Sequence, residues 1–153
     1  MSSVDFSFDD TALQGKLDAL KAKLQAAARP AAQAAAQVLY DEVRLNSTRG
    51  GEFPHMSKKP HGYKGNPTAF SPGNLKAAIY QVYSKTNSVD GKQTYQISYN
   101  HKKAFYGRFL EFGTVKMAAK PFIRPAYDTK KAAALQASKA KFLELAKEAI
   151  NGA

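Results

Sequence analysis

The first part of the chain alternates apolar and polar residues with the period of an α-helix. The apolar positions are Leu13, Leu17, Leu20, Leu24, Ala27, Ala28, Ala31, Ala35, Val38 and Leu39. Spacings of three and four residues place them on one stripe, which predicts a helix over residues 9–46. Asp9 or Asp10 can cap its start, where the helix dipole favours a carboxylate. Pro30 lies inside the pattern and lacks a backbone donor, so we expect a kink or a break there.

Residues 47–73 follow neither the helical nor the strand period, and Gly and Pro recur throughout them. A loop of this length is unusual in a compact domain and is commonly either functional or disordered. Two interpretations stay open: an extended arm that orders on a partner, or an insertion without a role. If the segment is an arm, its interface candidates are Phe53, His55, Lys58, Lys59, Tyr63 and Phe70.

Two short runs with strand character follow the loop. Residues 78–84 are rich in β-branched and aromatic side chains, and residues 93–99 alternate with period two. Asp90 and Gly91 between them are typical of a tight turn. The sequence therefore predicts an antiparallel hairpin. The apolar and aromatic positions expected to share a face are Ile79 and Tyr83 in the first strand, and Tyr95, Ile97 and Tyr99 in the second.

The remaining chain predicts two helices joined by an extended segment. Asn100 can cap a short helix over residues 101–112, which Gly113 would end in the left-handed conformation. Pro121 and Pro125 favour extended backbone over residues 120–124, and Pro125 fits the first turn of a helix over residues 125–150.

The predicted class is α+β. It comprises a long N-terminal helix kinked at Pro30, a long loop, an antiparallel hairpin, a short helix and a long C-terminal helix. We expect residues 1–153 to form a single domain, divided into segments 9–46 (helical), 47–73 (arm or loop), 74–127 (hairpin and motif block) and 125–150 (C-terminal helix).

The 153-residue chain carries a net charge of +11, of which +7 falls within residues 73–127. Such an excess indicates attraction to phosphate or to an acidic protein surface, or a solvated basic face without a partner. The chain has no Cys. It shows neither a signal-peptide pattern at its N-terminus nor an apolar run near the roughly 20 residues that span a bilayer.

Nothing in the sequence indicates a catalytic, cofactor or metal site. The three histidines lie at positions 55, 61 and 101 without metal-ligand spacing. Between Glu52 and Asp128 the acidic residues are Asp90 and Glu111, which offer no carboxylate pair. GxSxG, GxxxxGK[ST] and GxGxxG are absent from the sequence. An enzyme is therefore the weakest of the functional hypotheses.

Two sequence blocks resemble a known family. FYGRFLEFGT at residues 105–114, with KMAAKPFIRPA at 116–126, is similar to the "Y-x-x-F-x-E-F-G-T … P-F-I-R-P-A" block of the neck or tail-completion (head–tail joining) proteins of long-tailed, lambdoid and related bacteriophages. GNLK at 73–76 resembles their "G-N-L-[RK]" element. The motif positions, which we expect to be scaffold, are Asn74, Leu75, Tyr106, Phe109, Glu111, Phe112, Gly113, Thr114, Pro121, Phe122, Arg124 and Pro125.

The resemblance implies a structural protein of the virion, made in the bacterial cytoplasm and placed at the head–tail junction. It further implies a ring of identical subunits, a hexamer, between the head-closure complex and the tail terminator, with a channel that phage DNA crosses. No cofactor and no membrane partner are expected. Two alternatives stay open: a tail-terminator or head-closure ring protein of the same junction, and a basic nucleic-acid-binding module.

Two motif residues allow a more specific prediction from physics. Glu111 stands just before the end of a predicted helix, where the dipole disfavours a carboxylate. It therefore needs a cationic partner, Arg108 or Arg124, unless it is a solvated acid on the helix surface. Phe122, between two prolines, is expected to be a core anchor.

Overall fold

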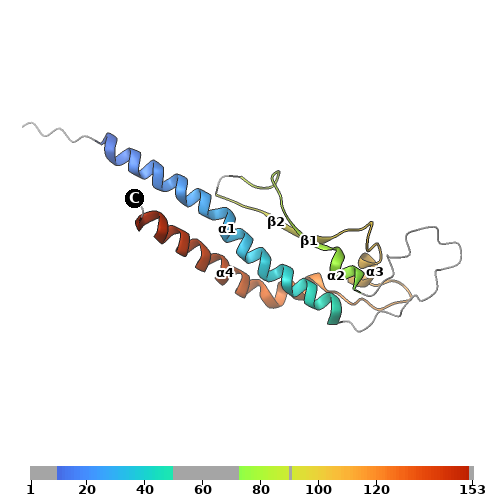
Figure 1. Cartoon of the computed structure of the whole chain (residues 1–153). Helices are drawn as coiled ribbons and strands as arrows, with labels where there is room; N and C mark the ends of the chain where they lie inside the picture. Colours follow the sequence, from blue (N-terminus) through green and yellow to red (C-terminus); the bar gives the residue numbers. More distant parts are fainter. Residues whose placement is uncertain (1–9, 50–72, 90, 152–153) are drawn as a thin grey trace, which may run out of the picture.

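The computed structural model describes residues 10–49, 73–89 and 91–151. Two long helices, α1 and α4, run antiparallel and side by side along the molecule, and the smaller elements gather toward one end (Figure 1). In chain order the elements are α1 (Thr11–Arg49), α2 (Asn74–Ala78), β1 (Ile79–Tyr83), β2 (Tyr95–Tyr99), α3 (Gly107–Phe112) and α4 (Ile123–Asn151). This order confirms the predicted α+β class.

The hairpin packs against α1, which also packs along α4. Strands β1 and β2 are antiparallel, and their register pairs Ile79 with Tyr99 and Tyr83 with Tyr95. These residues share one face of the sheet, as predicted. The guanidinium of Arg29 in α1 lies 4.5 Å from the centroid of the Tyr83 ring, so this face is directed toward α1. Each strand has one neighbour within the described residues, which leaves one edge of each strand without a strand partner.

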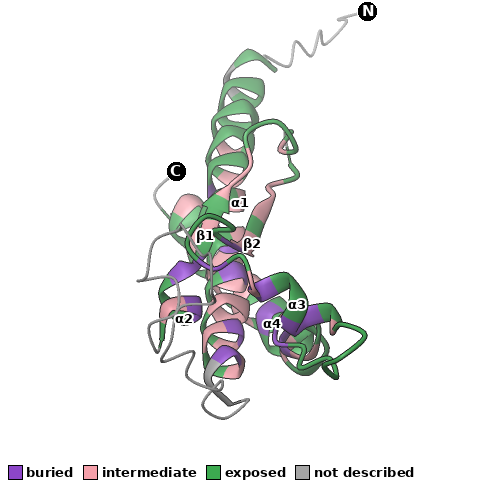
Figure 2. Ribbon diagram, turned by 90° about the vertical axis from the view of Figure 1, so that its right-hand side faces the viewer, coloured by how far each residue is buried: buried purple, intermediate pink, exposed green. Residues whose placement is uncertain are grey.

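The hydrophobic core is small and lies at the end of the molecule where all the elements meet. Its buried members are Val43, Leu75, Ala78, Ile79, Tyr99, Ala104, Leu110, Phe122 and Ala126. Figure 2 shows these buried positions around α2, α3 and the adjoining parts of α1 and α4, whereas the far half of α1 is largely exposed. Leu13 and Leu17 of the predicted apolar stripe are 47% and 56% exposed. The stripe is therefore buried only in part, from about Ala27 onward.

Helix α1 continues through Pro30 as a single element, so of the expected kink or break, the break is wrong. Pro30 is exposed, while Ala27 and Ala31 on either side of it are buried. The missing N–H removes one intrahelical hydrogen bond. We attribute the continuity of the helix to its packing along α4, since packing rather than propensity supplies most helix stability.

Three other boundaries differ from the prediction. Residues 74–78 form helix α2, whereas the strand was expected to begin at Ala78. The expected helix over 101–112 is reduced to α3, because the chain first makes a turn after Asn100. The extended segment over 120–124 is wrong at its end, since α4 already begins at Ile123. The expected arm falls largely on residues 50–72, which lie outside the described residues.

Candidate functional site

The carboxylate of Glu111 holds the first turn of α4. Glu111 Oε2 accepts hydrogen bonds from the backbone N–H groups of Phe122 at 2.8 Å and Ile123 at 3.1 Å, and Oε1 accepts one from Arg124 at 3.2 Å. The first N–H groups of a helix lack intrahelical partners, and the dipole there favours a negative charge. Pro125, also in this turn, has no N–H to satisfy. Glu111 therefore acts as an N-terminal cap that comes from a different helix.

Glu111 is 5% exposed, so the interpretation as a solvated acid is wrong. Of its two expected cationic partners, Arg124 lies within ion-pair range, with Nε 3.9 Å from Oε1. The Arg124 side chain is 64% exposed, and its guanidinium lies 4.7 Å from the centroid of the Phe112 ring. This ion pair is long and open to solvent, so the three backbone hydrogen bonds are the stronger interaction.

A tight return of the chain after α3 brings Glu111 to α4. Gly113 ends α3 with φ +76°, and an added Cβ there would lie 2.9 Å from the Ala119 backbone nitrogen. Thr114 and Met117 then exchange two backbone hydrogen bonds, so the backbone ties this turn. The N–H of Lys120 donates to the Leu110 carbonyl at 2.7 Å. At position 113, only glycine combines the positive φ with the close approach of the Ala119 backbone without strain.

The GNLK element is joined to the same region by a second set of contacts. The Asn74 side chain donates to the Lys103 carbonyl at 2.5 Å. Burial raises the pKa of the Tyr106 hydroxyl above its ordinary value of 10.0, while hydrogen bonds from the Asn74 side chain and the Leu75 N–H oppose the rise. Gly107 lies against the Tyr99 ring, which an added Cβ would meet at 2.7 Å. Asn74 and Tyr106 therefore fix α2 against the start of α3.

Burial also raises the pKa of the Tyr99 hydroxyl, with a smaller contribution from Glu111 and an opposing one from Arg108. The Tyr99 ring lies 5.9 Å from the Phe122 ring, centroid to centroid. Phe122 is 2% exposed, as expected of a core anchor. The two motif blocks and the hairpin thus meet in one packed junction.

The other side of α3 is exposed. Phe109 and Phe112 are three residues apart in α3, so they lie on one side of the helix, and Phe105 lies in the turn before it; the three are 47%, 61% and 41% exposed. Val115, at the tip of the following turn, is fully exposed. Exposed basic residues flank them: Lys102, Lys103, Arg108, Lys116, Lys120 and Arg124. We call this surface, the three phenylalanines and these basic residues, the α3 face.

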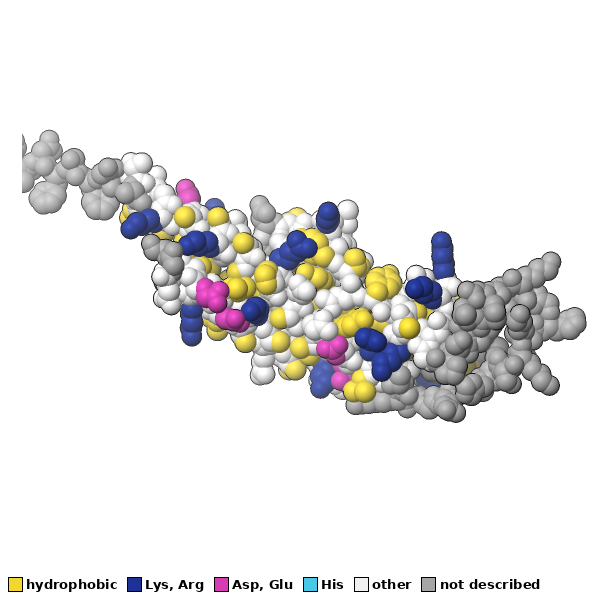
Figure 3. Space-filling model, in the orientation of Figure 1, with side chains coloured by type: hydrophobic (Ala, Val, Ile, Leu, Met, Phe, Trp, Pro, Cys, Tyr) yellow, Lys and Arg dark blue, Asp and Glu magenta, His cyan; other side chains and the backbone are white. Residues whose placement is uncertain are grey.

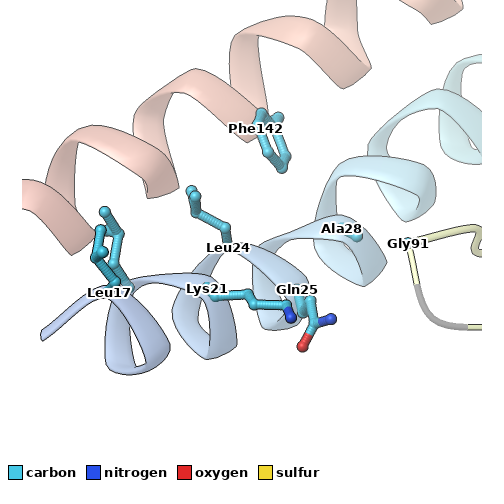
Figure 4. A pocket seen from close by; sticks show the side chains of 8 residues that line it. Leu17, Lys21, Leu24, Gln25, Ala28, Gly91 and Phe142 are labelled. Carbon is cyan, nitrogen blue, oxygen red and sulfur yellow. The ribbon is translucent and has the colours of Figure 1, made fainter. Parts of the chain in front are cut away.

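A shallow apolar groove runs between the far halves of α1 and α4. Leu17 and Leu24 point from α1 toward α4, and Phe142 points from α4 toward α1 (Figure 4). Gly91, in the hairpin connection, lies at its edge. The groove holds few polar groups and, in the described chain, no group of three or more His, Cys, Asp or Glu that could hold a metal ion.

The structure places the motif residues together and leaves the arm candidates undetermined. Phe53, His55, Lys58, Lys59, Tyr63 and Phe70 lie outside the described residues. Among the motif positions, Leu75, Glu111 and Phe122 are buried, whereas Phe109 and Phe112 belong to the exposed α3 face. The lysines of residues 73–127, the segment with the largest positive excess, are all exposed: Lys76, Lys85, Lys92, Lys102, Lys103, Lys116 and Lys120. Lys and Arg side chains lie along much of the face shown in Figure 3.

Sequence reasoning identified Glu111 and the Pro121–Pro125 block but missed the link between them. The residues that Glu111 binds contribute backbone N–H groups, which leave no trace in residue identity. The available signal was Pro125 in the first turn of α4. A proline there indicates the start of a helix, where the first backbone N–H groups need a hydrogen-bond acceptor.

These features define a class: a small α+β protein whose motif residues fix the start of a long helix and leave an aromatic, basic surface exposed. A model of the family described as "Bacteriophage HK97-gp10, putative tail-component" matches residues 11–113, and the protein belongs to this family. The match includes Glu111 but ends before the N–H groups that it binds. No curated protein and no solved structure matched the chain.

Family membership confirms the resemblance to bacteriophage neck and tail-completion proteins. It indicates a component of the virion that contacts other virion proteins. Within residues 10–49, 73–89 and 91–151, no helix combines the length and apolar character needed to cross a membrane.

Proposed function

We propose that this protein is a subunit of a ring at the head–tail junction of a long-tailed phage. In this role it joins the head-closure complex to the tail terminator and surrounds the channel through which DNA passes. The ring has six copies, and no catalytic step is involved. Residues 47–73 reach a neighbouring subunit or an adjacent ring, and the chain acts as a single domain.

The observation that carries this proposal is the large apolar surface that stays exposed to solvent around a small buried core. Five large apolar side chains are each between 47% and 61% exposed: Leu17, Phe109, Phe112, Leu143 and Ile150. These residues lie in α1, α3 and α4, and exposed apolar surface of this kind commonly marks a protein–protein contact. The open strand edges add further pairing capacity. A closed ring of identical subunits covers such surfaces on every copy.

A tail-terminator or head-closure ring is the nearest alternative, and the family match to a tail component does not separate it from a neck ring. A nucleic-acid-binding module is favoured by one observation, the exposed basic residues beside the phenylalanines of the α3 face. A channel that DNA must traverse gains nothing from tight phosphate contacts, because each of them slows sliding. We therefore assign the basic excess to acidic protein neighbours.

Imaging of intact particles that contain this chain tests the proposal. We expect a closed ring of this protein between the portal-proximal rings and the tail tube. One or two asymmetric copies at the junction would contradict the ring. A ring that forms the end of the tail in detached tails would identify the tail terminator instead.

A further inference from the structure

The α3 face is an apolar, positively charged surface whose own residues include no acid, and Asp128, one turn after Arg124 in α4, is the next exposed acid along the chain. From Gly91 to Tyr127 the one acidic residue is Glu111, which is buried and whose two carboxylate oxygens accept three backbone hydrogen bonds. Phe109 and Phe112 are about half exposed at its centre. A partner that fits this surface presents aromatic or aliphatic side chains together with carboxylates.

The chain itself contains a segment with this chemistry. Residues 4–9 read VDFSFD, with two Asp, two Phe and one Val, and no Lys or Arg precedes Lys16. Val4, Phe6 and Phe8 have the period of an extended strand, so in that conformation they project to one side. We propose that residues 4–9 of one copy dock on the α3 face of a neighbouring copy. The inference rests on the proposed ring.

The same copy cannot supply this segment to its own α3 face. The Asn46 side chain donates to the Phe122 carbonyl, and the Phe122 N–H binds Glu111 of α3, so α3 lies beside the C-terminal end of α1. From Thr11 to Asn46 the helix rises about 53 Å. Residues 4–9 reach at most about 21 Å from Asp10 when fully extended. Figure 1 shows the start of α1 and α3 at opposite ends of the molecule. Docking is therefore between copies, head to tail, which is the arrangement that closes into a ring.

Disulfide trapping tests the contact directly, because the chain has no Cys. One full-length copy carries Ser7→Cys, and the other carries Thr114→Cys, an exposed position two residues beyond Phe112. Docking raises the effective concentration of the two thiols, so mixed copies should crosslink about tenfold faster than a mixture of Ser7→Cys with Val89→Cys. Val89 is 64% exposed on the hairpin and serves as the collision control. The doubly substituted chain should form crosslinks between copies, not within one.

Two substitutions on the Thr114→Cys copy, each with a matched control, identify the forces involved. Lys116→Glu should slow the crosslink several-fold and Lys139→Glu, on exposed α4, should leave it unchanged. Phe109→Ala should slow it, and Leu135→Ala, at a comparably exposed apolar position on α4, should not. High salt should weaken the wild-type contact, because screening shortens the range of the attraction.

If purified copies show no enrichment over the Val89→Cys control, the same pairs are examined in assembled particles. No enrichment in either setting overturns the proposal, as does a crosslink confined to single chains. Competition by short duplex DNA at sub-micromolar concentration would assign the α3 face to nucleic acid instead. A ring seen by imaging without the crosslink rejects the docking alone. The crosslink without a ring at the junction rejects the proposed function alone.

Discussion

The carboxylate of Glu111 and the backbone N–H of Phe122 lie 2.8 Å apart, with ten residues between them in the sequence. Through this contact α3 supplies the N-terminal cap of α4, a helix of 29 residues. The contact joins the two halves of the family block into one structural unit.

Replacing Glu111 should therefore destabilise the fold more than replacing an exposed acid. Glu111→Gln leaves an amide facing three backbone N–H groups, so we expect the free energy of unfolding to fall by about 1–3 kcal/mol. Urea denaturation followed by circular dichroism measures the change. The matched control is Glu144→Gln, whose side chain is 55% exposed and pairs with Lys141. That change should stay within about 0.5 kcal/mol. Equal effects of the two substitutions would show that the cap contributes little.

Two glycine-to-alanine substitutions should have opposite signs. Gly113→Ala forces a side chain onto φ +76° and into the Ala119 backbone, so we expect a loss of about 1–3 kcal/mol. Gly15 lies within α1 with no atom near the position of an added Cβ. Gly15→Ala should therefore stabilise the protein by about 0.5–1 kcal/mol. Thermal melting of both variants checks the pair, and a neutral Gly113→Ala would refute the tight return after α3.

Tyr106 should make the folded protein less stable at alkaline pH. Burial raises the pKa of its hydroxyl in the folded chain above 10.0, so the folded state retains this proton where the unfolded state loses it. The resulting stability is complete below the unfolded pKa and is lost as pH rises through the folded pKa. The chain has no Trp, so tyrosinate absorbance at 295 nm is unobscured. Subtracting the pH titration of Tyr106→Phe from that of the wild type isolates the tyrosinate signal of Tyr106. Its midpoint should lie at higher pH in buffer, where the chain is folded, than in denaturant, where it is unfolded. A coincident midpoint would contradict the buried setting.

Removing residues 52–68 should leave the fold intact but stop assembly. The core of the described residues is built by α1, α2, the hairpin, α3 and α4, so we expect an almost unchanged unfolding transition. Particles carrying the deletion should fail to join tails. A Gly/Ser replacement of equal length is the control, because it keeps the spacing and removes the aromatic side chains. Unfolding of the deletion variant would place the segment in the core, and normal joining of tails would show that it is dispensable.

Free protein should bind duplex DNA weakly and without sequence preference. Basic residues oriented toward protein neighbours give only non-specific attraction, with dissociation constants weaker than about 10⁻⁶ M at physiological salt. Titration of labelled duplexes at several salt concentrations measures both affinity and the number of phosphate contacts. Sub-micromolar, sequence-selective binding that survives 150 mM salt would favour the nucleic-acid-binding module.

Local periodicity predicted the elements well where one face of an element is buried. The alternation of Tyr95, Ile97 and Tyr99 predicted which side chains share one face of the sheet. The apolar stripe through Ala27 and Ala31 predicted the N-terminal helix. The same reasoning does not reveal whether another element packs against an apolar stripe and buries it. Phe105, Phe109 and Phe112 have core spacing but face outward, and Leu13 and Leu17 extend beyond the core.

Interactions with backbone groups were beyond sequence reasoning. Glu111 was expected to need a cation, and the residues that satisfy it could be of almost any type, because they contribute N–H groups. Helix α2 was missed because Ala77 and Ala78 adjoin a clear strand pattern, and its length of five residues is too short for periodicity to register.

The attachment at Glu111 also has a mechanical consequence. Helix α4 extends about 44 Å from its first turn, so the capped turn is the pivot of a long lever. A rotation of about 10° at that pivot displaces the far end by roughly 8 Å for a rod of this length. Because α1 packs along α4 and also against the hairpin, these elements would move together relative to α3. Slight differences in the seating of α3 would then change the spacing of the distant helix ends, and one scaffold could adjust to openings of different width.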